Sequence, residues 1–87
     1  MTEETLFEFP CDFPIKVMGR ADAGLEALVI EILQRHAPDF DPATLAVRDS
    51  RQRNYLALTA TIRATSREQL DNIYLELTAC EQVLMAL

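Results

Sequence analysis

The sequence predicts an α+β fold of the ferredoxin-like type: a βαββαβ sandwich in which two helices cover one face of a four-stranded antiparallel sheet. Among its 87 residues, two stretches have helical periodicity and four have strand-like patterns, in the order strand, helix, strand, strand, helix, strand. Two such halves with right-handed crossovers build this sandwich around its first and third strands. We expect one domain over residues 12–87, after a flexible N-terminal leader over residues 1–11.

The first strand and the first helix follow from the spacing of apolar side chains. Residues 13–19 alternate apolar side chains with Lys16 and Met18, which places the two sets on opposite faces of a strand. Residues 22–37 repeat apolar side chains at helical spacing, and we expect Asp22 to be the N-cap of this helix. These two elements form the first half of the sandwich.

Two strands open the second half. Residues 44–48 and 55–65 alternate in polarity, and the polar residues 49–54 between them are typical of a hairpin connection. The longer strand is rich in threonine, which favours strands. In the shorter strand we expect Leu45 and Val47 to face inward.

The second helix begins with a predicted capping box, in which Ser66 is followed three residues later by Gln69. Its apolar stripe is expected to extend to Cys80. The apolar run over residues 82–87 then predicts the last strand.

In this fold the helices leave one face of the sheet uncovered, as antiparallel sheets allow. That face is either simply solvated or the surface that binds a partner or ligand. We expect this face to carry one of the two alternating sets of side chains of the last strand. Its other expected residues are Lys16, Met18, Ala46, Arg48, Tyr55, Ala57, Thr59, Thr61 and Arg63.

Charge is unevenly distributed along the chain. The formal net charge is −6, which disfavours nucleic acids, whose affinity for proteins comes mainly from neutralised phosphates. RNA binding on the open sheet face is a weaker alternative, because Tyr55 is the one aromatic side chain expected there. Residues 42–67 hold five arginines against one acid, Asp49, and so predict a local positive patch. The predicted partner-binding residues are Lys16, Arg48, Arg51, Arg53, Tyr55 and Arg63.

Recognisable catalytic and metal-binding patterns are absent from the sequence. His36 is its one histidine and falls at a helix end, where a cation complements the helix dipole. Cys11 and Cys80 match no metal-ligand spacing, and we expect them to be reduced, small apolar side chains rather than redox groups. The expected protein is therefore non-enzymatic, without metal or cofactor. With neither a signal peptide nor a membrane-spanning run, it is expected in the cytoplasm.

Four stretches of the sequence resemble the YbeD-like family of small bacterial proteins. They are residues 9–19 (FPCDFPIKVMG), the Asn-Tyr pair that begins the threonine-rich strand, residues 65–74 (TSREQLDNIY) and the ending at residues 83–85 (VLM). The chain departs from the family at residues 51–53, where Arg-Gln-Arg replaces a turn of the Ser-Lys-Gly type and enlarges the positive patch.

The resemblance implies a fold similar to ACT regulatory domains, which bind small ligands such as amino acids at subunit interfaces. It also implies a link to lipoate metabolism, because the family is named as a lipoate regulator. The turn that carries ligand-binding backbone in ACT domains corresponds here to Met18, Gly19 and Arg20. We therefore expect a regulatory or adaptor protein, acting through a protein partner, a homodimer or a small ligand. The alternative is a module that docks an acidic acyl-carrier-type partner through its arginine-rich hairpin.

Overall fold

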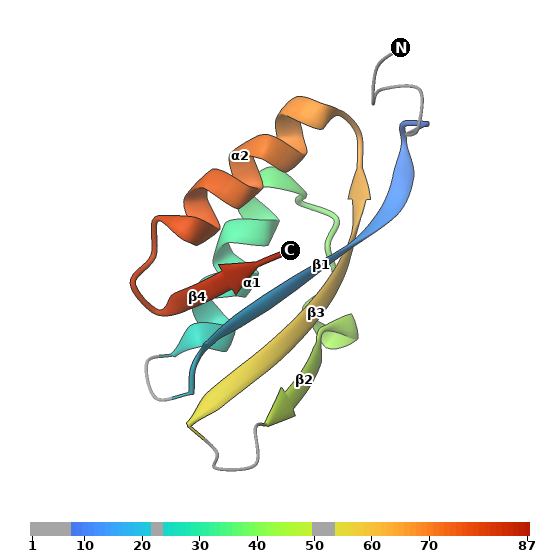
Figure 1. Cartoon of the computed structure of the whole chain (residues 1–87). Coiled ribbons are helices and arrows are strands. Elements are labelled where there is room, and N and C mark those ends of the chain that lie inside the picture. Colours follow the sequence, from blue (N-terminus) through green and yellow to red (C-terminus); the bar gives the residue numbers. More distant parts are fainter. Residues whose placement is uncertain (1–7, 22–23, 50–53) are drawn as a thin grey trace.

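The computed structural model describes residues 8–21, 24–49 and 54–87 of the chain (Figure 1). Its elements confirm the predicted βαββαβ order and fold class. They are β1 (Cys11–Arg20), α1 (Leu25–His36), the short 3-10 helix η2 (Pro42–Thr44), β2 (Ala46–Asp49), β3 (Tyr55–Ala64), α2 (Arg67–Thr78) and β4 (Val83–Ala86).

The four strands form one antiparallel sheet in the order β2-β3-β1-β4, so β1 and β3 are central as predicted. These two strands pair along their whole length, from Cys11 opposite Ala64 to Arg20 opposite Tyr55. The ladder between β1 and β4 is shorter, and its register shifts after Met18. Strand β1 therefore lies between its long antiparallel partner β3 and the edge strand β4.

Both helices lie on the same face of the sheet (Figure 1). The period of two along the central strands sends every second side chain toward them. The core consists of these side chains and of the apolar stripes of α1 and α2. Its largest fully buried members are Ile15, Val17, Leu25, Val29, Leu33, Leu58, Ile62, Ile73 and Leu77.

Helix α1 begins later than predicted, and its N-cap is not Asp22. The cap is Gly24, whose φ of 66° is left-handed and which makes no side-chain cap hydrogen bond. Glycine adopts this conformation without steric cost, so the chain can turn into the helix here. Asp22 lies outside the described residues.

The capping of α2 is confirmed, with one difference in its hydrogen bonds. The hydroxyl of Ser66 accepts from the backbone N–H of Gln69 at 3.1 Å, as a capping box requires. The side-chain oxygen of Gln69, Oε1, accepts from the backbone N–H of Thr65 at 2.7 Å rather than from that of Ser66. The side-chain nitrogen of Gln69, Nε2, donates to the backbone oxygen of His36 at 2.8 Å, which links the start of α2 to the end of α1.

The end of α2 corrects the sequence prediction. The helix ends at Thr78, so Cys80 is not part of it. The thiol of Cys80 still donates to the backbone oxygen of Glu76 at 3.3 Å, and its side chain packs against the core.

Strand β2 is shifted toward the C-terminus relative to the predicted residues 44–48. A carboxylate oxygen of Asp41 accepts from the N–H of Ala43 at 3.0 Å, which caps the 3-10 turn that contains Thr44. The strand therefore starts only at Ala46. Val47, predicted to face inward, shares a side of the sheet with Leu58, but it stays 44% exposed because β2 is a short edge strand.

At the other end of the sheet, β1 starts at Cys11, the last residue of the predicted leader. Phe9 packs partly buried against the core. Residues 1–7 of that leader lie outside the described residues.

Gly19 lets β1 approach the segment that leads into β4. A Cβ atom at this position would lie 2.3 Å from the backbone oxygen of Gln82 and within 2.9 Å of both δ carbons of Leu25. The backbone oxygen of Gln82 already accepts a hydrogen bond from the N–H of Arg20 at 3.0 Å. Gly19 is thus required by a close approach within the chain itself.

We predict that Gly19→Ala lowers the free energy of unfolding by about 3 kcal/mol, because the clash is with backbone that cannot move aside cheaply. Chemical denaturation followed by circular dichroism measures this loss. The control is Gly24→Ala, where nothing lies within 4 Å of the added Cβ and only the positive φ is unfavourable. It should cost about 1 kcal/mol. Equal losses for the two variants would contradict the close approach at Gly19.

Candidate functional site

The uncovered face of the sheet carries side chains in rows that run across all four strands. Backbone pairing places Leu87, Lys16, Thr59 and Ala46 in one row. The next row consists of Met85, Met18, Ala57 and Arg48. All nine residues predicted for this face lie on it, and none of them is fully buried.

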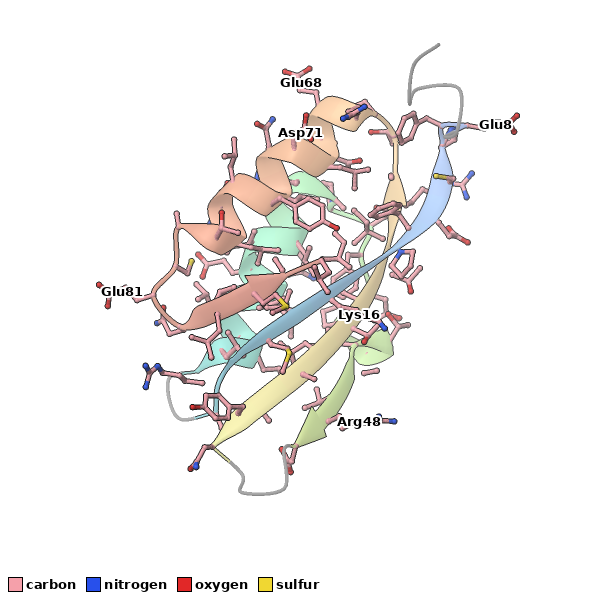
Figure 2. The ribbon with its side chains drawn as sticks, viewed as in Figure 1. Glu8, Lys16, Arg48, Glu68, Asp71 and Glu81 are labelled. Atoms are coloured by element: carbon pink, nitrogen blue, oxygen red, sulfur yellow. The ribbon has the colours of Figure 1, made fainter. Side chains whose placement is uncertain are left out.

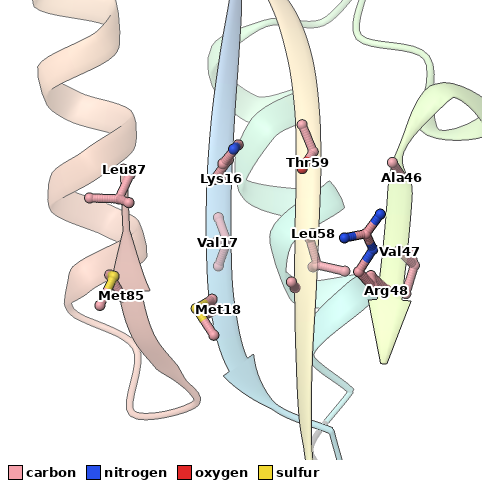
Figure 3. A pocket seen from close by; sticks show the side chains of 11 residues that line it. Lys16, Val17, Met18, Ala46, Val47, Arg48, Leu58, Thr59, Met85 and Leu87 are labelled. Carbon is pink, nitrogen blue, oxygen red and sulfur yellow. The ribbon is translucent and has the colours of Figure 1, made fainter. Parts of the chain in front are cut away.

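A hollow of about 450 Å³ lies over these two rows (Figure 3). Its middle is low because Ala46, Ala57 and Thr59 carry small side chains, whereas longer side chains surround them. Volumes of this size are typical of small-molecule sites. A smaller hollow of about 160 Å³ shares Met18, Arg48 and Ala57 with the first and continues to Tyr55.

The hollow is positively charged. Lys16 on β1 and Arg48 on β2 line it from either side of β3 (Figure 3), and none of its described lining residues is acidic. Within residues 8–21, 24–49 and 54–87, neither cation forms an ion pair. Such a site favours an anionic ligand, since both positive charges remain available.

The other predicted partner-binding residues are placed differently. Tyr55 lies on the same face and lines the smaller hollow. Arg63 lies at the far end of the sheet, where its guanidinium is 3.6 Å from a carboxylate oxygen of Asp12. Arg51 and Arg53 lie outside the described residues.

The predicted ligand-binding turn divides between two environments. Met18 points into the hollow, whereas Gly19 is buried against Leu25 and Gln82. Arg20 is exposed and lies opposite Tyr55 in the ladder. A ligand-binding role for these residues stays a prediction.

Met85 and Leu87 complete the hollow, and the sequence alone did not identify them. The last six residues are almost uniformly apolar, so alternation cannot say which of them face outward. The pairing of Met85 with Met18 after the shift in register decides it. The signal that could have found them is the irregular pairing inside β4, between Val83 and Met85, and the composition of the strand does not reveal it.

His36 takes part in a polar cluster on the helical side of the molecule. Its Nε2 lies 2.5 Å from a carboxylate oxygen of Glu76 on α2, and Arg35 forms an ion pair with the same carboxylate. Arg35 also lies 3.3 Å from Glu31, one turn earlier on α1. The hydrogen bond from His36, helped by the charges of Arg35 and His36, lowers the pKa of Glu76 below its usual value. The cluster joins the two helices, and His36 is engaged in that link.

Cys11 and Cys80 are both half-buried free thiols that pack against the core. No group of three histidine, cysteine or acidic side chains in the described part of the chain could hold a metal ion. None of the helices among the described residues has the length and apolar composition needed to cross a membrane.

Comparison with known families gives a match over nearly the whole chain. Residues 4–87 match the family model described as "Protein of unknown function (DUF493)". A UPF0250 protein of Nitrosomonas europaea is 58% identical over 74 residues, which cover 85% of each chain. Another from Ectopseudomonas mendocina is 53% identical over 81 residues, or 92% of this chain and 88% of that one. The resemblance to YbeD-like proteins is thereby confirmed, and these names assign no activity.

The fold also has a solved counterpart. The solution structure of protein HP0495 from H. pylori superposes with a TM-score of 0.69 over 93% of this chain and 85% of that one, at 16% identity. At this level of identity the likeness concerns the fold alone.

The lowered pKa of Glu76 predicts how stability depends on pH. The ionised carboxylate is favoured in the folded state, so its contribution is fully present above the unfolded value of about 4.5 and is lost as the pH falls through the lowered folded value. Glu76→Gln should therefore destabilise the protein at neutral pH and flatten the loss of stability on acidification. Urea unfolding from pH 7 to pH 3 measures this effect.

The control for this experiment is Glu81→Gln, an exposed carboxylate without an ion pair among the described residues. Its stability curve should follow that of the unmodified protein. If Glu76→Gln also followed that curve, the link between the helices would contribute nothing measurable.

Proposed function

We propose that this chain, which belongs to the DUF493 family of bacterial proteins of unknown function, is a non-enzymatic regulatory or adaptor protein that binds an anionic partner on the open face of its sheet. The observation that carries this proposal is the hollow, where Lys16 and Arg48 flank an apolar floor and none of the described lining residues is acidic. Asp49, which follows Arg48, lines only the adjoining smaller hollow. Cations left without partners beside exposed apolar surface are typical of a binding site.

Binding is favoured over catalysis by the surroundings of these groups. Acid–base or nucleophilic chemistry needs a titratable or nucleophilic side chain beside a second group that activates it. The hollow offers Thr59 as a hydroxyl, and its described lining contains no histidine or acidic side chain to activate it. His36 is on the helical side of the sheet, engaged with Glu76.

Charge separation across the molecule supports an acidic partner. Among the described residues, the open face carries the cations Lys16, Arg20, Arg48 and Arg63 and the acid Asp12, and Asp49 lines the smaller hollow beside it. The helical side is acidic, and Figure 2 shows Glu68, Asp71 and Glu81 there, away from Lys16 and Arg48. An acidic protein is therefore attracted to one face and repelled by the other.

The resemblance to YbeD-like proteins gives this partner a biological setting. Their named link to lipoate metabolism, together with the positive face, supports an acyl-carrier-type domain as the acidic partner. The protein would then act by occupying or presenting the carrier, without changing it chemically.

We predict that Lys16→Glu combined with Arg48→Glu slows association with a purified acidic carrier domain by roughly ten- to hundredfold at low salt. The loss should shrink at high salt, because screening weakens the attraction that steers the encounter. Biolayer interferometry with acyl carrier protein and with a lipoyl domain measures the rates.

The matched control combines Arg67→Glu with Asn72→Glu and Ala79→Glu, three exposed positions of α2 and its C-cap, which lowers the net charge by the same four units on the opposite side of the molecule. This variant should bind as the unmodified protein does. Equal rates for the unmodified and the charge-reversed proteins, or no binding of either carrier, would contradict the proposal.

A second candidate is an ACT-like module in which two copies pair through β4. The edge of the sheet at β4 and the neighbouring part of α2 expose Leu75, Leu84 and Leu87, which are 67%, 52% and 66% accessible. Another hollow, lined by Tyr74, Leu75 and Ala86 among others, runs between the helix and the strand. Pairing of edge strands across a two-fold axis would cover this surface.

Light scattering over a range of protein concentrations tests this second candidate. It predicts the mass of a dimer, and a monomer mass for the variant Leu75→Lys with Leu84→Lys. The control variant Thr61→Lys, exposed at a distance from β4 on the open face, should keep the dimer. A monomer at every concentration would rule out pairing through β4.

A further inference from the structure

The hollow on the open face combines two kinds of surface that one ligand would have to match. One part is apolar: the thioethers of Met18 and Met85 and the side chain of Leu87 stand along it, with Ala57 beneath. Met18 and Met85 are 44% and 48% exposed, so much of their surface faces water. Methionine side chains adapt to flexible apolar ligands because they are unbranched and polarisable.

The other part offers hydrogen-bond donors. Lys16 and Thr59 are neighbours in one row, and Arg48 stands at the β2 end of the next. Lys16 and Arg48 are separated by two strand spacings, or about 10 Å across the sheet. Their long side chains can converge over the small residues between them. A guanidinium also binds a carboxylate through two parallel hydrogen bonds.

The two parts lie side by side in a fixed order. The donors cross the hollow from Lys16 on β1, over Thr59 on β3, to Arg48 on β2, and the thioethers continue from Ala57 toward β4 along the row of Met18 and Met85. We infer that the hollow binds a medium-chain alkanoate or the equivalent acyl carboxylate. Its head lies among Lys16, Thr59 and Arg48, and its chain lies over Met18 and Met85. This inference rests on the proposed anion-binding role of the open face and names the class of ligand.

Other anions fit the hollow less well. A nucleotide would need an aromatic side chain to stack its base, and Tyr55 lines only the smaller hollow. A small anion such as acetate would satisfy the cations and leave the thioethers exposed. An alkanoate covers both surfaces at once.

Calorimetric titration with hexanoate, octanoate and decanoate, each below its micelle concentration, tests the inference. Affinity should rise about threefold to fourfold for each added methylene until the apolar surface is covered. Octanol and octylamine carry the same chain without the carboxylate, and each should bind at least tenfold more weakly than octanoate. Equal binding of the three eight-carbon probes, or no dependence on chain length, would overturn the inference.

Two variants locate the site. Arg48→Gln should weaken octanoate binding about tenfold or more, because a charge-assisted hydrogen bond is lost. Ala57→Leu should abolish binding by filling the floor of the hollow without changing its charge. Thr61→Leu adds a similar side chain to the same strand and face, outside the hollow, and should bind octanoate normally. Normal binding by Ala57→Leu would place the ligand elsewhere and overturn the inference.

The same preparations separate this inference from the function on which it rests. If a carrier domain associates through Lys16 and Arg48 while no alkanoate binds, the alkanoate site is wrong and the anion-binding face stands. If neither binds, both fail. If alkanoates bind and the carrier domains do not, the hollow is a small-molecule site and the acidic protein partner is excluded.

Discussion

The ladder between β1 and β3 is the constraint on which the core and the candidate site both depend. Along β1, Ile15 and Val17 enter the core, while Lys16 and Met18 face the opposite way. A slip of one residue in the pairing would exchange the two sets and bury a lysine. The hydrophobic effect that fixes the core therefore also holds the cation and the thioether of the open face in register.

The second constraint is the approach of β4 to β1. Gly19 leaves room for the backbone at Gln82, and the shift in register beside it sets Met85 opposite Met18. A larger residue at this position would move the edge strand and open the apolar side of the hollow. Gly19 thus contributes to the site by shaping the sheet beneath it, although a side chain at this position would point toward the core.

Elements that depend on local patterns were predicted from the sequence. Alternation along β1, β2 and β3 placed nine residues on the open face, and the spacing of Ser66 and Gln69 marked the start of α2. Features that depend on tertiary contacts were not predicted from the sequence. The outward set of β4 is one of these, because it depends on how the strand pairs with β1. Two local features were also missed: the left-handed conformation of Gly24, and the turn in which Asp41 accepts from the N–H of Ala43. Likewise, the sequence predicted a positive patch, but only the strand pairing shows that Lys16 and Arg48 share one hollow.

We propose that the open face of the sheet, and not the helical face, binds anions. The most direct measurement is a map of backbone amide chemical shifts in isotope-labelled protein titrated with octanoate and with a carrier domain. We expect shifts at the amides of Lys16, Met18, Arg48 and Ala57, while the amides of α1 and α2 remain unchanged. Shifts confined to the helices, or a spectrum that neither probe alters, would contradict it.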